Sequence, residues 1–394
     1  MKTLMILGAS VLQLPAVIKA KEMGNRVVVV DRDKSAVAIA YADLFENIST
    51  LDIDRVREAA KKHCIDGIMT LASDMPMRTV AKVSHDLGLV GVSEETAMKA
   101  TDKLSMRKCL QENKIPIPRF FKVSSLTEYT KAVSSLDAFC IVKPSDNSGS
   151  RGVSKIENIE QASSAFTYAK QFARQGDLVV EEYLSGHEVS VESITVKNET
   201  HVIAITDKKT TGAPEFVEMG HVQPSKLDRE TQDLIVDITR SSIKAIGLEE
   251  GPSHTEIIIT GDGPKVVEIG ARLGGDNITT HLVPLSTGVD IVKCSIHIAL
   301  GEPVFVDRTL KKGAAIRFIE SKPGRIVSIT GIEEAKKICG VKQITFNKKT
   351  GDWANVIRDS SDRLGFVIAQ ADTREAAISI CNKAVNRISI QTGE

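Results

Sequence analysis

Two glutamates, Glu256 and Glu268, lie in a stretch whose pattern predicts a β-hairpin. The stretch covers residues 253–276, and its two apolar runs flank a turn rich in Gly and Asp at residues 261–264. If the turn centres on Asp262, the two carboxylates lie directly opposite each other, about 4.5–5.5 Å apart at Cβ, and repel unless a cation lies between them. Magnesium, which proteins hold with one or two carboxylates together with substrate phosphates, is the simplest such cation.

The alternation of side chains along a strand gives this hairpin two different faces. His254 and Arg272 fall on the same face as the two glutamates, so we expect two acids and a basic rim there. The opposite face is expected to enter a core with Ile257, Ile259, Val267 and Ile269. The alternative is a solvated strand face, and a slip of one residue in one strand would separate the two carboxylates.

Two lysines and a small-residue loop are suited to phosphate groups. Lys103 falls in the first turn of a helix predicted over residues 99–113 with Thr101 as its cap, where the helix dipole disfavours a cation that has no anionic partner. Lys143 ends an apolar strand and precedes a loop whose backbone N–H groups can cradle phosphate oxygens, formed by Ser148, Gly149, Ser150, Arg151 and Gly152. The alternatives are a surface lysine and a simple hairpin tip, since the loop lacks the GK(S/T) ending of the phosphate loop that opens a helix.

The sequence LVVEEYLSGHEVSVESITV predicts two strands separated by a kink at Ser185 and Gly186. We expect the second strand to enter a new sheet, which makes the kink a natural hinge between two small domains. Glu188 beyond the kink can reach ribose hydroxyls. The end of the first strand can present backbone groups to an adenine edge through Glu181, Glu182, Tyr183 and Leu184. The alternative is an exposed acidic corner.

Residues 2–98 alternate strands and helices, which predicts a parallel sheet covered on both faces. Gly8 after the first strand and Asp31 after the second suggest a dinucleotide-binding fold. Because the GxGxxG pattern is not satisfied, a nicotinamide site is only an alternative, and we expect this region to frame one wall of a substrate cleft. Pro116 and Pro118 stop the helix before them and mark a domain boundary.

The composition argues against several classes of partner and site. The 394 residues are enough for two or three domains, and they include 51 Lys and Arg against 51 Asp and Glu, with only 4% aromatic residues. The chain therefore lacks the net charge and the stacking groups that suit nucleic acid or a membrane surface. The six dispersed cysteines predict free thiols in a reducing cytoplasm rather than a zinc site or disulfides. No apolar run is long enough to span a bilayer.

Taken in order along the chain, these lysines, loop, hinge and acid pair resemble the ATP-grasp superfamily. Within it they are similar to the carboxylate–amine ligases, such as the L-amino acid ligases and the synthetases and carboxylases of purine synthesis. The resemblance implies a mixed α/β and α+β fold. Its parts are a Rossmann-like N-terminal domain (1–98), an ATP-grasp domain (99–305, with a small lobe over about 116–184 and a large lobe over 185–305) and a C-terminal ligase-type domain (306–394).

The resemblance also implies roles for individual residues. Lys103 and Lys143 are implied to contact the phosphates of ATP, and residues 148–152 to form a mobile loop that closes over them. Residues 181–184 are implied to bind adenine, and Glu188 to bind ribose. The resemblance assigns Mg²⁺, with Mn²⁺ as an alternative, to Glu256 and Glu268, and the transferred phosphoryl group and acyl phosphate to Arg272 with Gly274 and Gly275. Glu218 and His221 are implied to face the substrate.

One departure from the family pattern lies at the second metal acid. Many members have Asn two residues after it, whereas the run here is EIGAR, from Glu268 to Arg272. A third protein ligand is therefore not expected, and water can replace it. The EIGAR form and the ending of the chain, AAIRFIESKPGRI followed by RLGFVIAQADTREAA, are similar to the L-amino acid ligases.

The activity implied is ATP-dependent ligation of a small-molecule carboxylate to an amine, with an acyl phosphate as the intermediate and ADP as a product. No protein nucleophile is expected, because the chain has no GxSxG elbow. An amino acid is the favoured substrate, and a homodimer is expected by analogy only. The alternatives are a purine-pathway type of synthetase or carboxylase and a non-catalytic ATP-binding switch.

Overall fold

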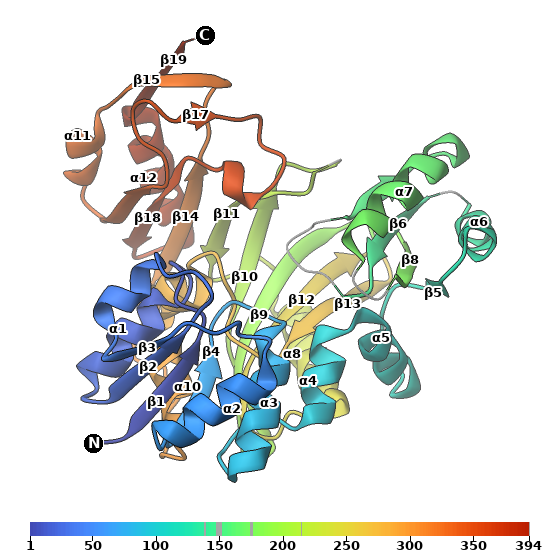
Figure 1. Cartoon of the computed structure of the whole chain (residues 1–394). Helices are drawn as coiled ribbons and strands as arrows, with labels where there is room; N and C mark the ends of the chain where they lie inside the picture. Colours follow the sequence, from blue (N-terminus) through green and yellow to red (C-terminus); the bar gives the residue numbers. More distant parts are fainter. Residues whose placement is uncertain (138, 147–151, 174–175, 214, 394) are drawn as a thin grey trace.

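Figure 1 shows the chain as a computed structural model that describes residues 1–137, 139–146, 152–173, 176–213 and 215–393. Four residues of the predicted phosphate loop, Ser148, Gly149, Ser150 and Arg151, lie outside the described residues. In the described part of the chain the strands form four sheets. These sheets correspond to an N-terminal layer, a small lobe, and one long sheet that carries a smaller sheet at its C-terminal end.

The N-terminal sheet is parallel, in the order β3-β2-β1-β4. Its elements alternate along the chain: β1 (Thr3–Leu7), α1 (Leu14–Glu22), β2 (Arg26–Val30), the 3-10 turn η1 (Val37–Tyr41), β3 (Leu44–Glu46), α2 (Ile53–Lys62), β4 (Gly67–Thr70) and α3 (Pro76–Leu87). In β1, Leu4 and Ile6 pack into one core, and Met5 and Leu7 pack into another. The predicted parallel sheet with both faces covered is therefore confirmed.

The helix predicted over residues 99–113 is divided into α4 (Glu94–Thr101) and α5 (Lys103–Glu112). The prediction that Thr101 caps this helix is wrong. Asp102 separates the two helices in extended backbone, and its carboxylate accepts a hydrogen bond from the backbone N–H of Ser105 at 2.7 Å. Aspartate is a strong N-cap, and this one leaves Lys103 at the first position of α5.

The small lobe is an antiparallel sheet in the order β5-β8-β6-β7. Its elements are β5 (Phe120–Val123), α6 (Leu126–Ser135), β6 (Cys140–Pro144), β7 (Ser154–Ile156), the 3-10 turn η2 (Ile159–Gln161), α7 (Ala162–Phe172) and β8 (Leu178–Glu182). A core of its own, which includes Tyr129 and Val142, fills the space between sheet and helices. In Figure 1 the lobe stands to one side of the long sheet.

The longest sheet is antiparallel throughout, in the order β13-β12-β9-β10-β11-β14-β18-β16. The large lobe supplies β9 (His187–Val196), β10 (Glu199–Thr210), β11 (Glu218–Gln223), α8 (Arg229–Ile246), β12 (Gly251–Thr260), β13 (Gly263–Gly270), the short π-helix η3 (Ile278–Leu282), α9 (Val283–Thr287) and α10 (Ile291–Ala299). The kink predicted at Ser185 and Gly186 is confirmed, because β8 and β9 on either side of it belong to different sheets.

The C-terminal elements extend this sheet and add another. They are β14 (Gly313–Ile319), β15 (Gly324–Thr330), α11 (Ile332–Lys336), β16 (Val341–Phe346), β17 (Trp353–Ala354), the 3-10 turn η4 (Ser360–Asp362), β18 (Gly365–Ala371), α12 (Arg374–Arg387) and β19 (Ser389–Gly393). Strands β17, β15 and β19 form a separate small sheet. Because β11 pairs with β14, the long sheet continues past the boundary expected between residues 305 and 306, and that boundary stays a prediction.

Among the described residues, none of the helices taken singly is long and apolar enough to cross a bilayer. The bent pair Ile278–Thr287 and Ile291–Ala299 passes that test of length and composition when its two halves are joined.

The predicted hairpin is formed by β12 and β13, and Glu256 pairs directly with Glu268. Pairing begins between Thr260 and Gly263, so the turn centres half a residue before the expected position at Asp262. Without a correction the two glutamates would be out of register. A β-bulge next to Glu256 supplies the missing residue and brings them opposite each other.

The bulge also changes one residue of the core face. Ile257 pairs with Val266, which is fully buried, whereas Val267 lines the main cavity of the protein. The expected core position of Val267 is therefore wrong, because the extra residue turns its side chain to the other face. Ile257 and Ile269 are buried as predicted, and Ile259 packs against the same core.

Candidate active site

A cavity of about 670 Å³ lies between the two lobes, with further walls from the N-terminal and C-terminal regions. Nearly all the predicted site residues that are described line it: Lys103, Lys143, Glu181, Glu182, Tyr183, Leu184, Glu188, Glu218, His221, Glu256, Glu268, Arg272 and Gly275. Gly152 and Gly274 do not line it. The structure therefore gathers residues spread over about 170 positions of sequence around one cavity, although their roles stay predictions.

The two hairpin glutamates each contact a lysine from another element. Lys103 Nζ lies 3.0 Å from Glu268 Oε1, and Lys208 Nζ lies 2.9 Å from Glu256 Oε1. Both carboxylates are partly exposed to the cavity, at 27% and 24%. Opposed, accessible carboxylates are suitable oxygen ligands for Mg²⁺. No group of three or more His, Cys, Asp or Glu in the described ranges is arranged to hold a metal, so phosphates or water would complete the coordination.

Lys143 contacts an acid instead of standing alone. Its Nζ lies 2.7 Å from Glu181 Oε2, and Arg107 Nε donates to the other oxygen of Glu181 at 2.7 Å. Burial would raise the pKa of Glu181, but the charges of Arg107 and Lys143 hold it at about 2. The side chain of Glu181 is thus committed to these cations, which leaves only its backbone for the predicted adenine contact. Arg107, fully buried on α5, was not anticipated from sequence.

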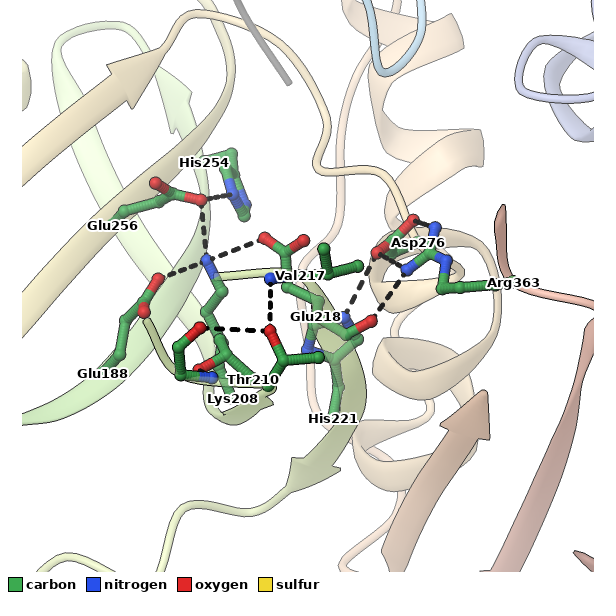
Figure 2. A network of polar contacts seen from close by, with 12 residues as sticks. Glu188, Lys208, Thr210, Val217, Glu218, His221, His254, Glu256, Asp276 and Arg363 are labelled. Carbon is green, nitrogen blue, oxygen red and sulfur yellow. Dashed lines mark hydrogen bonds and ion pairs between the residues drawn. The ribbon is translucent and has the colours of Figure 1, made fainter. Parts of the chain in front are cut away.

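Lys208 is the centre of a second cluster that sequence reasoning missed (Figure 2). Its side chain is 3% exposed, and its Nζ lies 2.5 Å from Glu188, 2.9 Å from Glu256 and 3.3 Å from Glu218. These acids come from β9, β12 and β11, and Lys208 itself lies on β10. Burial would lower the pKa of Lys208, but the three carboxylates raise it well above its usual value, so the ammonium stays charged. One cation therefore contacts all three acids that are predicted to bind ribose, metal and substrate.

His254 is held by a buried glutamate behind the acid pair. Its Nδ1 lies 2.6 Å from Glu192 Oε1, and its Nε2 lies 3.6 Å from Glu256 Oε1. Burial would lower the pKa of His254, but Glu192 raises it to about 9. A Cβ at Gly274 would lie 2.6 Å from His254 Nδ1 and 2.9 Å from Glu192 Oε2. Gly274 is therefore needed for the close packing of this pair, which is a reason for glycine other than the predicted substrate contact.

Arg272 connects the hairpin to the N-terminal domain. Its Nε donates to Asp74 Oδ1 at 2.7 Å, and both side chains are 13% exposed at the cavity wall. Asp74 follows β4, at the carboxyl edge of the parallel sheet, where ligands of open α/β sheets commonly bind. The N-terminal domain thus supplies one wall of the cavity, as the sequence predicted.

His221 and Glu218 lie on β11, and Lys208 joins Glu218 to Glu188, two residues beyond the hinge. His221 is 1% exposed, and neither ring nitrogen has a hydrogen-bond partner among the described residues. At the hinge end, the Tyr183 ring contacts Phe139, with ring centroids 5.0 Å apart. Lys155 Nζ lies 4.2 Å from the centroid of the same ring. The cavity therefore has an aromatic end at the hinge and a polar end beside His221.

Two family models match the sequence. The ATP-grasp domain matches residues 136–280, and the L-amino acid ligase C-terminal domain 2 matches residues 317–393. An uncharacterised protein of Sinorhizobium fredii is 28% identical over 327 residues, which cover 81% of this chain and 67% of that protein. The alanine–anticapsin ligase of Bacillus subtilis is 26% identical over 253 residues, which cover 58% of this chain and 53% of that ligase.

A solved structure resembles the whole chain. The L-amino acid ligase of Bacillus licheniformis superposes with a TM-score of 0.86 at 23% identity, covering 100% of this chain and 99% of that one. The predicted fold is thereby confirmed, and the two domain matches agree with it. The chain therefore contains an ATP-grasp domain and a C-terminal domain of the L-amino acid ligase type, and it shares its overall fold with the L-amino acid ligase of Bacillus licheniformis.

Proposed function

We propose that the protein uses ATP to activate a small-molecule carboxylate as an acyl phosphate and couples it to an amine, with ADP and phosphate as the other products. The observation that carries the proposal is the single cavity in which the opposed acids Glu256 and Glu268 face the cations Lys103, Lys143 and Arg272. Phosphoryl transfer depends on positioning and charge neutralisation more than on covalent help, and this set of residues provides both.

We propose that Lys103 and Lys143 receive the phosphates of ATP, and that residues 181–184 and Glu188 bind its adenine and ribose. Glu256 and Glu268 would hold Mg²⁺ or Mn²⁺, which when bound neutralises charge on the phosphates. The two lysines contact Glu268 and Glu181 in the structure, so binding would exchange a carboxylate partner for a phosphate partner.

In the first chemical step, a substrate carboxylate oxygen attacks the γ-phosphorus, and the bond from that phosphorus to the bridging oxygen breaks to release ADP. Arg272 would bind the transferred phosphoryl group, with Asp74 holding its guanidinium at 2.7 Å. The fixed positive charge of Arg272 would stabilise the negative charge of the transferred phosphoryl group. Exclusion of water by the closed lobes would protect this intermediate from hydrolysis.

In the second step, the amine attacks the acyl carbon, loses a proton and displaces phosphate. A proton acceptor must be unprotonated beforehand. The pKa of His254, raised to about 9 by Glu192, leaves that imidazole already protonated near neutral pH. His221, whose ring nitrogens have no hydrogen-bond partner in the described part of the chain, is the better candidate for the acceptor.

The polar end of the cavity favours an amine over a ribose-phosphate substrate. Its lining includes Asp74, Glu218, Asp276 and Asp359. Arg272, a cation of the same cavity, contacts Asp74 and is already assigned to the transferred phosphoryl group. A phosphorylated purine precursor would instead need available cations there. All six cysteines are free, which supports the proposed cytoplasmic setting, and the homodimer stays a prediction.

The test of this function is phosphate release from ATP and Mg²⁺ with single amino acids, amino acid pairs and purine-pathway carboxylates, with product masses measured. We expect phosphate and ADP in equal amounts with a condensed product from an amino acid pair. Turnover only with a purine-pathway carboxylate would move the assignment to that branch. Tight ATP binding in calorimetry without turnover in any mixture would favour the non-catalytic switch.

Lys143→Ala is expected to raise the Kd for ATP by about tenfold or more, the size expected when a charged hydrogen bond to phosphate is lost. Calorimetry with a non-hydrolysable ATP analogue measures this change. The matched control is Lys122→Ala, which removes a half-exposed lysine of the same lobe that pairs with Asp177. An unchanged Kd for Lys143→Ala would mean that Lys143 serves only to pair with Glu181.

A further inference from the structure

Asp276 lines the polar end of the cavity in an unusual backbone conformation. Its φ is +51°, and the next residue, Asn277, has φ +62°. Non-glycine residues in the left-handed region are uncommon, cost free energy and persist where their surroundings fix them. The side chain of Asp276 is 26% exposed, so its carboxylate remains accessible from the cavity.

Arg363 of the C-terminal domain fixes this carboxylate with two parallel hydrogen bonds. Its Nη1 and Nη2 groups donate to the two oxygens of Asp276 at 2.7 and 2.8 Å (Figure 2). The same Nη1 donates to the backbone carbonyl of Glu218 at 3.1 Å, and the guanidinium stacks 3.7 Å from the centre of the Phe318 ring. A planar guanidinium held in this way defines the position of its partner. A residue near the end of the chain thus orients a group of the large lobe.

The carboxylate of Asp276 keeps its charge and some acceptor capacity. Burial would raise its pKa, but the two hydrogen bonds from Arg363 and the charge of that guanidinium hold it well below its usual range. Each carboxylate oxygen can accept more than one hydrogen bond. His221 Nε2 lies 3.6 Å from Asp276 Oδ2, too far for a hydrogen bond, and neither of its buried nitrogens has a hydrogen-bond partner in the described ranges. Two polar groups therefore face the same part of the cavity with unused hydrogen-bonding capacity.

We propose that Asp276 binds the amine substrate in its ammonium form and that Arg363 is the positioning residue that holds Asp276 for this task. This inference rests on the proposed ligase function and adds the group that recognises the second substrate. An ammonium ion has three donors and a positive charge, which suit a fixed carboxylate. The bound ammonium lies beside His221, the candidate acceptor of the proton that it must lose before it attacks, and the second proton, released after attack, would leave with the displaced phosphate. The C-terminal domain would then contribute directly to the choice of amine.

The test compares two nucleophiles with the same carboxylate. One is the amino acid that reacts best as the amine in the panel above, and the other is hydroxylamine, which is neutral under mildly alkaline conditions and traps acyl phosphates as hydroxamates. Asp276→Asn should raise the KM for the amino acid by about 10- to 100-fold, the size of a lost charge-assisted hydrogen bond. Hydroxamate formation should change by less than about twofold, because carboxylate activation does not use Asp276.

Arg363→Lys provides the second variant, since lysine keeps the charge but cannot form both hydrogen bonds. It should raise the KM for the amino acid by a smaller factor than Asp276→Asn, with kcat for hydroxamate formation retained. The control is Arg374→Met, which breaks another ion pair between the C-terminal domain and the large lobe, to Asp207, outside the cavity. It should leave the KM for the amino acid unchanged.

Equal losses with both nucleophiles, or an unchanged KM for the amino acid in both variants, would overturn the inference. Failure of the wild-type protein to form a hydroxamate with any carboxylate would instead contradict the proposed function. The two failures are therefore distinguishable in the same set of assays.

Discussion

Glu268→Gln is expected to lower ATP-dependent phosphate release by about 100- to 1,000-fold, the range seen when one preorganised charge-stabilising group is lost. The change keeps the shape of the side chain but removes the charge that pairs with Lys103 and that would hold Mg²⁺ opposite Glu256. Because the Glu268 side chain is 27% exposed at the cavity, its loss should affect stability far less than turnover. Phosphate release with the active substrate pair, with a thermal melt of the same sample, measures both quantities.

The matched control for Glu268→Gln is Asp262→Asn, which removes an acid at the exposed turn of the same hairpin. It should leave turnover unchanged. Glu256→Gln should act like Glu268→Gln, and both variants should need more Mg²⁺ than the wild type for their remaining activity. Normal turnover and normal Mg²⁺ dependence in either glutamine variant would show that the opposed pair is not the metal site.

The acid pair was predictable because it depends on local pattern. The alternation of β12 and β13 and the Gly- and Asp-rich turn predict the hairpin, and a turn centred on Asp262 would place Glu256 opposite Glu268, as the structure has them. The detailed register was not predictable. A half-residue error in the turn is compensated by a bulge that moves Val267 to the cavity, and nothing in the local sequence indicates a bulge there.

The charged partners of the site could not be predicted, because they meet only in the folded chain. Arg107 reads as an ordinary polar residue of an amphipathic helix, yet it is fully buried against Glu181, 74 residues away. Arg363 and Asp276 are 87 residues apart and come from different domains. The resemblance to a family predicted which residues bind nucleotide and metal, but it carried no information about which residues orient them.

Lys208 shows the same limit most clearly. The run TDKKT resembles a solvated strand. The alternation of side chains along a strand shows only that Lys208 and its exposed neighbour Lys209 point to opposite faces. Lys208 contacts three acids because of the strand order. In the sheet, β10 lies between β9 and β11, and β12 lies beyond β9. Strand order is a property of the whole sheet, so a local pattern could not reveal it.

Lys208→Met should lower both stability and turnover, because it leaves Glu188, Glu218 and Glu256 close together without the cation they share. Removing one partner from a buried charge cluster costs about 3–5 kcal/mol, and partial exposure of these acids should reduce that to about 1–3 kcal/mol. Turnover should fall by about 100-fold or more, since the three acids predicted to bind ribose, substrate and metal would no longer be held in place by one cation. Denaturant unfolding and phosphate release measure the two effects.

Magnesium should distinguish loss of a shared cation from general damage to the sheet. With Lys208 gone, Glu256 has no ammonium to compete with a metal, so added Mg²⁺ should raise the melting temperature of Lys208→Met more than that of the wild type, by binding the folded state alone. Lys209→Met, the exposed neighbour on the same strand, should match the wild type in stability, turnover and response to Mg²⁺. A Lys208→Met protein with wild-type stability, or one that Mg²⁺ stabilises no more than the wild type, would mean that Lys208 does not hold the acids together. The charge would then be balanced elsewhere in the cavity, and Lys103 beside Glu268 would be the next cation to test.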